Sequence, residues 1–283
     1  MTPLLLIPFL ALSVQAVPPG RLDAARAVER ARYAFVIGAT QPFDAVYPPA
    51  VFEQRVTREL AEERVLEQVF GVTLTAAQLA QEFDRIERTT RAPEQWDAIK
   101  AALGHDRRRI EDTFCRPLLV DLTLQARFAF DLRIHAESHA HAREARALML
   151  QGATPPDAAR LVLSRHGTPD GAVDDLLKRA RAEAVVPRVL RPPDEPPQSA
   201  PVALHPEAAA ALEAQLLRPG DVSTVLSEWD RFTVYRLVES TDEAWTVEAG
   251  VFPKRDFESW FRETSTPGPL IGTLNQPERS PTH

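Results

Sequence analysis

The sequence predicts an α+β protein that is mostly helical, with its few strands near the C-terminal end. Three observations support this prediction. Apolar residues recur at helical spacing through most of residues 22–151, whereas residues 231–238 alternate between apolar and polar side chains. The chain has 283 residues, 44% of them hydrophobic, so it can bury the cores of two modest domains.

The first 16 residues have the pattern of a secretory signal peptide. Met1–Leu12 is an apolar run without charge, and Ala16 closes a stretch that a signal peptidase could cleave. The run is shorter than the roughly 20 apolar residues that a membrane-spanning helix needs. We therefore expect a periplasmic or secreted protein that is cleaved after Ala16 and then has no stable membrane span.

Charge and cysteine content narrow the function further. The net charge of -7 argues against nucleic acid as a partner, because proteins that bind polyanions are usually basic. The single cysteine, Cys115, cannot form an internal disulfide. We expect it to be a small buried residue on a helix, since a catalytic thiol would require a partner histidine in space.

The N-terminal half predicts successive helices, most of them bounded by a residue that favours a helix start or end. In chain order they are 22–34; 52–70, ended by Gly71; a helix capped by Thr75; one opened by Pro93 and ended by Gly104; and a long one that Asp106 caps and that reaches Phe128. Pro117 is expected to kink the last helix, because proline removes a backbone donor. Its inward stripe includes Leu118 and Leu122.

The C-terminal half is expected to contain the strands. These elements are strands near 222–226, 231–238 and 245–252, a short strand near 131–135, and helices over 137–151, 172–183 and 254–262. The stretch 187–206 holds seven prolines and predicts either a flexible linker or a surface loop within a domain, and we favour the loop. The tail 264–283 is rich in proline and glycine and is expected to be disordered.

Two segments near the C-terminus resemble parvulin-type peptidyl-prolyl isomerase domains. Leu216–Ser223, followed by Arg231–Glu239, is similar to the helix, "PGxxS" turn and final strand of that family, with the helix ending at Pro219–Gly220. Residues 154–167 resemble the parvulin segment in which a helix is followed by a polar turn. The resemblance implies a divergent parvulin-like domain over 131–239, followed by a strand and helix over 240–263.

The helices before this domain resemble the N-terminal module of SurA-like and PrsA-like chaperones. The resemblance lies in Val65–Gly71, which ends one helix, and in Leu74–Leu79, which opens the next. It implies a helical chaperone-like module over 21–130.

Parvulins hold a proline ring in an apolar pocket and surround the twisting amide with polar groups, without a covalent step. The resemblance places Thr233 where the family has a histidine in its final strand, and Leu204 in the apolar floor. His166 matches a cysteine or aspartate position, and His135 a histidine of the first strand.

Several family residues are missing at the matching positions. Either Ala208 or Ala210 stands where the family has a phenylalanine, and 174–177 lacks the glycine turn. An aromatic ring supplies much of the apolar contact in such a pocket. We therefore expect weak or no isomerase activity; if the chain is an enzyme, it is a peptidyl-prolyl cis-trans isomerase that uses His166, Thr233 and His135.

The histidines His135, His139 and His141 also raise the question of a metal site. His135 and His139 are four residues apart, as zinc ligands on a helix can be, but Glu137 is one residue late for the metalloprotease pattern. We expect a solvated helical segment and no metal or cofactor.

Together these features predict an extracytoplasmic chaperone or foldase that binds unfolded, partly folded or proline-containing polypeptides. The alternative is a non-enzymatic scaffold or assembly factor that binds one folded partner. The sequence leaves the oligomeric state open.

Overall fold

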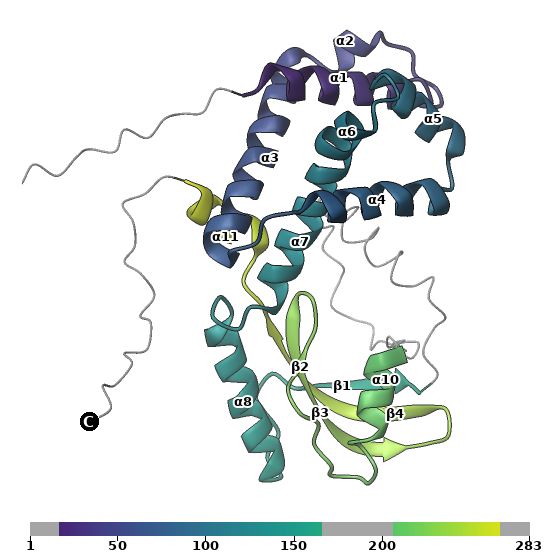
Figure 1. The fold of residues 1–283 in the computed structure, drawn as a ribbon. Helices are drawn as coiled ribbons and strands as arrows, with labels where there is room; N and C mark the ends of the chain where they lie inside the picture. The colour runs from purple at the N-terminus through teal and green to yellow at the C-terminus, as the bar shows by residue number, and fades with distance from the viewer. Residues whose placement is uncertain (1–16, 166–205, 267–283) are drawn as a thin grey trace, which may run out of the picture. The chain divides into compact units, whose positions relative to one another are not determined.

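The computed structural model describes residues 17–165 and 206–266 (Figure 1). These residues belong to two compact units. In the described part, the first unit comprises 17–127 and 261–266, and the second comprises the rest, within 128–260. The chain therefore leaves the first unit, builds the second and returns to the first. His166, Leu204, the helix expected over 172–183 and the first 16 residues lie outside the described residues, as does the proline-rich stretch up to residue 205.

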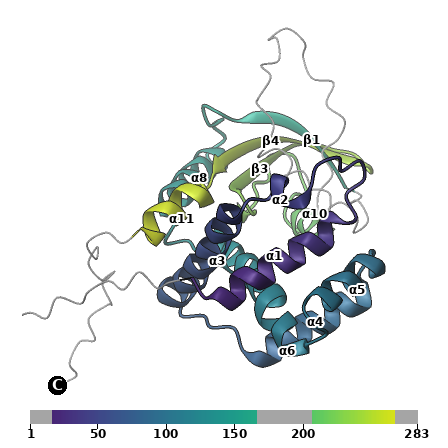
Figure 2. The ribbon, with the colours of Figure 1, turned by 90° about the horizontal axis from the view of Figure 1, so that it is seen from above.

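The described residues of the first unit are helical and contain no strand. Its elements are α1 (Pro19–Tyr33), α2 (Phe43–Val46), α3 (Pro49–Phe70), α4 (Ala76–Thr89), α5 (Pro93–Ala102), α6 (Arg107–Ile110), the π-helical turn η1 (Glu111–Cys115) and most of α7 (Arg116–Phe130), with the end of α11 (Phe257–Ser265). Figure 2 shows α1 beside α3 and α5, and residues of α1 contact both helices.

Short-range chemistry determines the helix boundaries, as the sequence predicts. Gly71 has φ of 65°, a left-handed conformation that glycine adopts without strain, and its N–H donates to the carbonyl of Glu67. The hydroxyl of Thr75 accepts from the N–H of Gln78, and the Gln78 side chain accepts from the N–H of Thr75. This reciprocal capping box starts α4.

The core of the first unit forms where α1, α5 and η1 meet. Val28, Trp96 and Leu103 are buried in one cluster with Cys115, which has no exposed surface. The prediction that Cys115 is a small buried residue is confirmed. Burial raises the pKa of its thiol to about 12, so the group is held in the unreactive, protonated form.

A π turn, η1, lies where the sequence predicts a proline kink. Pro117 has no N–H to donate to the preceding turn, and the N–H of Arg116 donates to Glu111 five residues back. The additional residue in this turn shifts the inward face of α7 to Val120, Leu124 and Phe128. Leu122 is consequently exposed, and its prediction as a core residue is wrong.

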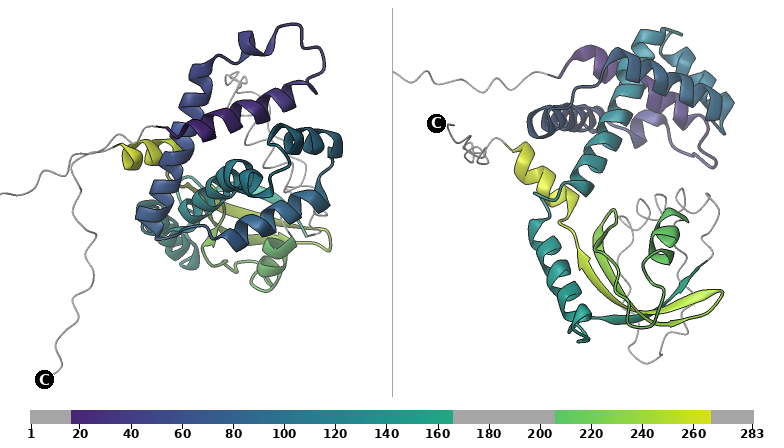
Figure 3. Two further views of the ribbon diagram at one scale, coloured as in Figure 1. Left: turned by 45° about the horizontal axis from the view of Figure 1, so that its top comes forward. Right: turned by 60° about the horizontal axis from the view of Figure 1, so that its bottom comes forward.

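The second unit contains an antiparallel sheet of four strands in the order β1-β4-β3-β2. The strands are β1 (Ala159–Ser164), β2 (Leu226–Ser227), β3 (Arg231–Ser240) and β4 (Ala244–Pro253). One face packs on α8 (Ala136–Leu150) through Phe232 and Val234, and the other packs on α10 (Pro206–Glu213) through Tyr235 and Leu237 (Figure 3, right). The expected class, α+β and mainly helical with a small antiparallel sheet, is confirmed; β3 and β4 lie where they are predicted.

The strand expected near 131–135 is absent, and these residues form turns. The carboxylate of Asp131 accepts from the N–H of Arg133 at 2.9 Å, and the carbonyl of Asp131 accepts from the N–H of Ile134 at 3.1 Å. These local bonds occupy the groups that a strand would pair with a neighbour.

Residues Ala159–Ser164 form strand β1 of this sheet, whereas the parvulin resemblance implies a helix there. Leu161 and Leu163 of β1 pair with Val247 and Trp245 of β4, and Leu163 is buried in the core on the α10 face. Alternation of leucine with Val162 suits a strand that buries one face. The implied helix over this stretch is therefore wrong.

The helix before the "PGxxS" turn also ends earlier than predicted. α10 stops at Glu213, whereas the sequence places the end at Pro219–Gly220. The carboxylate of Asp221 accepts from the N–H groups of Leu217 and Arg218 at 2.9 and 2.7 Å, which holds these residues in a turn. The strand expected near 222–226 is reduced to a bridge at Val222 and the two-residue β2.

At the C-terminal end, α11 extends to Ser265, beyond the point where the sequence predicts disorder. Among the described residues, no helix has both the length and the apolar character that crossing a membrane requires.

Candidate functional site

The candidate site lies at the end of the sheet where β2 and β3 form a hairpin. Successive residues of a strand point to opposite faces, so Thr233 and Tyr235 face the α10 side while Phe232 faces the α8 side. Among the described residues, the two polar side chains that the sequence singles out for catalysis, Thr233 and His135, lie near this hairpin but on different faces of the sheet.

The turn that follows α10 lies along the outer edge of β3. Gly220 donates its N–H to the carbonyl of Leu237 at 2.8 Å, and Leu237 donates to Asp221 at 2.9 Å. Further along, Ser223 donates its N–H to the carbonyl of Tyr235, whose N–H donates to the Ser223 hydroxyl. Ser223 is fully buried, and its role in this geometry is to fix the turn to the strand.

Thr233 is hydrogen-bonded on the α10 face. Its hydroxyl donates to the carboxylate of Glu228 at 2.7 Å. Thr233 and Tyr235 are only 2% and 5% exposed, and burial raises the pKa of Tyr235. Since the hydroxyl of Thr233 has a partner within the fold, it is not free to polarise a substrate amide in this arrangement.

His135 lies on the other face of the sheet and is buried in the core rather than solvated. Its Nε2 lies 2.8 Å from the carbonyl of Phe128, and the N–H of Arg255 donates to Nδ1 at 3.2 Å. Nδ1 must therefore be the acceptor and Nε2 the protonated nitrogen, so the ring is neutral. Burial lowers the pKa of His135, in part opposed by its bond to Phe128.

The expectation of a solvated histidine segment is correct for His141, which is exposed, but wrong for His135. His139 is half-buried, with its ring 5.2 Å from the ring of Phe232. The described residues contain no group of histidine, cysteine and carboxylate side chains that could hold a metal ion.

Lys254 is a polar group that sequence reasoning missed. It is 8% exposed, and its ammonium donates to the carbonyl of Ala129 at 2.6 Å, to the Ser227 hydroxyl at 2.9 Å and to the carbonyl of Glu228. Burial lowers its pKa to about 8. At pH 7 the side chain is thus mainly charged. Its hydrogen bonds join the residue after β4 to the end of α7 and to the β2–β3 hairpin. A lysine directly after an apolar strand is the only signal of this role in the sequence.

The structure does not bring the predicted site residues together. Thr233 and His135 lie on opposite faces of the sheet, separated by β3. His166, Leu204 and the side chain of Ala208 lie outside the described residues, and Ala210 is exposed on α10.

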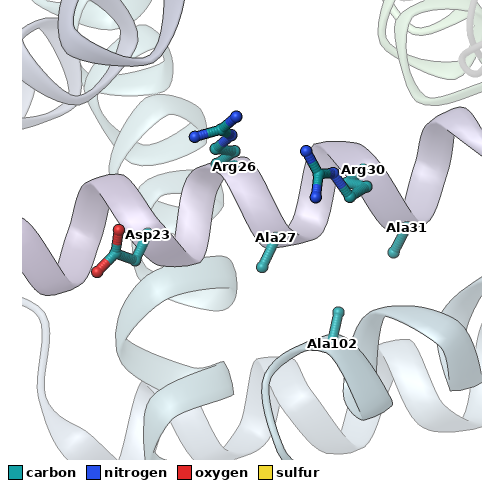
Figure 4. Close-up of a pocket in the computed structure, with 6 residues that line it drawn as sticks. All are labelled: Asp23, Arg26, Ala27, Arg30, Ala31 and Ala102. Carbon is teal, nitrogen blue, oxygen red and sulfur yellow. The ribbon is translucent and has the colours of Figure 1, made fainter. Parts of the chain in front are cut away.

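A separate open groove lies in the first unit between α1 and α5 (Figure 4). It has a volume of about 520 Å³ and is lined by Asp23, Arg26, Ala27, Arg30, Ala31 and Ala102. Arg26 and Arg30 both donate to the carboxylate of Asp44, at 2.7 and 3.0 Å. The guanidinium groups are engaged by Asp44, and the other lining residues are three alanines and the carboxylate of Asp23, so no nucleophilic side chain lines the groove.

Comparison of the chain with protein-family models, with curated proteins and with solved structures finds no significant match.

Proposed function

We propose that the protein is an extracytoplasmic chaperone or foldase related to parvulin-type isomerases. It binds unfolded or proline-containing polypeptide and has little or no isomerase activity. The observation that carries this proposal is the succession of α10, the 217–223 turn and β3, with the turn hydrogen-bonded along the strand. The turn and β3 lie in the segments, Leu216–Ser223 and Arg231–Glu239, whose sequence resembles the last third of a parvulin domain, and α10 ends at Glu213, before the first of them.

The helical unit supports the same proposal. The end of α3 at Gly71 and the capping box at Thr75 lie where the sequence resembles a SurA-like module. A helical unit joined to a small α+β unit suits the capture of extended chains, since the two can contact different parts of one client.

The state of the polar residues explains why we propose binding rather than catalysis. Thr233, at the position where the resemblance implies a histidine, already donates to Glu228, and the nitrogen atoms of His135 both have partners within the fold. Lowering the barrier to amide rotation, roughly 18–20 kcal/mol, requires polar groups that can contact the twisting bond.

Aggregation of chemically unfolded clients tests the binding function. We expect the purified protein to suppress the aggregation of several unrelated clients, in proportion to its concentration. Suppression of none, together with stoichiometric recovery of a single folded partner, would instead support a scaffold or assembly factor.

Isomerisation of a short proline-containing peptide tests the catalytic part. We expect a rate equal to the uncatalysed process, which takes roughly tens to hundreds of seconds. If the protein does accelerate the reaction, His166→Ala should lower the rate by about tenfold or more without loss of helical signal, which corresponds to about 1.4 kcal/mol of barrier.

The proposed location has its own test. Mass spectrometry of the protein from its native host should find a chain that begins at Val17. An intact Met1 on cytoplasmic protein would contradict export.

A further inference from the structure

Two large aromatic side chains are exposed together beside the β2–β3 hairpin. Trp229, in the hairpin turn, is 45% exposed, and Phe130, the last residue of α7, is 53% exposed. Their ring centroids are 5.9 Å apart and the ring planes meet at 83°. Single exposed apolar residues are common, but two half-exposed rings that pack edge to face form a fixed apolar surface. We call the angle between the rings of Phe130 and Trp229 the aromatic corner, or the corner.

Lys254 contacts the Phe130 side of the corner. The ammonium lies 4.9 Å from the centre of the Phe130 ring and donates to the carbonyl of the preceding residue, Ala129. A cation over the ring face and a fixed backbone on its N-terminal side restrict the Phe130 ring before any ligand arrives. A surface that is rigid beforehand loses less conformational entropy when it binds.

The polar groups around the corner indicate an uncharged ligand. Asp230 and Glu228 share Arg231, at 2.8 and 3.7 Å, with the ammonium of Lys254 beside them, and Asp131 pairs with Arg133 at 2.6 Å, so cations balance these carboxylates. The indole N–H of Trp229 has no acceptor among the residues that the structure describes. The corner therefore offers aromatic faces and one hydrogen-bond donor.

A proline-containing segment in an extended conformation complements these features. Proline has a compact apolar ring and no N–H, and the carbonyls of a polyproline-type helix make no internal hydrogen bonds, so they are free to accept. Proline-rich segments of this kind dock in aromatic-lined grooves of other recognition domains.

We propose that Trp229 and Phe130 form a binding site for extended, proline-containing polypeptide. A proline ring of the ligand packs against both aromatic rings, in the angle that they form. A neighbouring carbonyl of the ligand accepts from the indole N–H of Trp229. The proposal rests on the proposed function, because it identifies the surface through which the protein holds such segments.

Calorimetric titration with a short oligoproline peptide tests the site on the full chain. We expect the wild-type protein to bind this peptide and to bind a matched peptide with alanine in place of proline at least about tenfold more weakly. Trp229→Ala and Phe130→Ala should each weaken oligoproline binding about tenfold or more, as truncation of an aromatic anchor does. Leu217→Ala provides the control, because Leu217 is 69% exposed in the same unit but lies in the turn after α10.

Three outcomes would overturn the site: no binding of oligoproline by the wild-type protein, equal binding of the alanine peptide, or unchanged binding by both aromatic variants. Circular dichroism of the variants checks that their folds are intact. The aggregation assay separates this site from the proposed function. Suppression of client aggregation without oligoproline binding would refute the site alone, whereas oligoproline binding without suppression would refute the chaperone function alone.

Discussion

Lys254 donates a hydrogen bond of 2.6 Å to the carbonyl of Ala129, a residue that precedes it by 125 positions in the chain. Ala129 lies in the last turn of α7, and Lys254 directly follows β4. The bond therefore joins the helix that leads into the second unit to the strand that leaves its sheet.

The first prediction concerns the contribution of this lysine to stability. Lys254→Met should lower the free energy of unfolding by about 1–3 kcal/mol, because the buried carbonyl of Ala129, the partly buried carbonyl of Glu228 and the Ser227 hydroxyl lose their donor. Urea denaturation measures the loss. Lys100→Met is the control: Lys100 is paired with Glu87 and Asp97 near the surface of α5, where such pairs contribute about 0–1 kcal/mol. Equal losses in the two variants would show that the bonds of Lys254 add nothing particular to stability.

The second prediction is a dependence of stability on pH at His135. Its pKa is lowered in the folded state relative to an unfolded value of about 6.5, so the unfolded chain binds more protons between the two values. Stability should therefore be fully present above pH 6.5 and fall as the pH drops through 6.5 toward the lowered pKa.

Urea midpoints at pH 7.5 and 5.5 test this dependence as a difference between variants. His135→Gln should lose stability at pH 7.5 but show a smaller further loss at pH 5.5 than the wild type. His141→Gln should follow the wild type, since His141 is exposed on α8. A wild-type-like pH dependence in His135→Gln would assign the effect to other groups.

The third prediction concerns the hydrogen bond between Thr233 and Glu228. Thr233→Val should lower the free energy of unfolding by about 0.5–1.5 kcal/mol, because it removes the bond to the Glu228 carboxylate. Glu228→Gln retains an acceptor oxygen for Thr233 and should cost less. In the double variant Thr233→Val/Glu228→Ala, the loss should be smaller than the sum of the single losses, because each single variant already removes the same bond. Strict additivity, measured by denaturation, would contradict this bond.

The fourth prediction concerns thiol reactivity. Cys115 has no exposed surface, and burial raises its pKa to about 12, so the native protein should not react with a thiol-specific reagent at pH 8. In denaturant the same cysteine should react fully and at once. Rapid reaction of the native protein would show that the core around η1 opens readily.

The sequence predicts the helices of the first unit well because their limits depend on neighbouring residues. Gly71 can adopt a left-handed conformation, Thr75 caps its own helix, and Pro93 suits a first turn. The exposed Leu122 was not predictable in the same way, since it depends on the π turn before α7.

The sheet and the site were harder to predict because they depend on distant partners. β1 is a strand because β4 pairs with it, and His135 is buried and neutral because Arg255 donates to it from 120 residues further along the chain. The partner of Thr233, Glu228, becomes its neighbour only through the geometry of the hairpin. A pattern in one segment carries no information about such contacts.

The pairing of β1 with β4 also determines when the protein can finish folding. Ala159 can pair only after Ala249 has been synthesised, and closing so long a loop is slow compared with forming a helix. The first unit is also completed late, because its Arg58 stacks over Phe261, 5.2 Å from the ring centre, and Phe261 is synthesised after the whole sheet. During synthesis the helices can form early, but the second unit cannot be completed until the ribosome has passed residue 250, nor the first until it has passed residue 261. The growing chain remains exposed to proteases and to other unfolded chains until then.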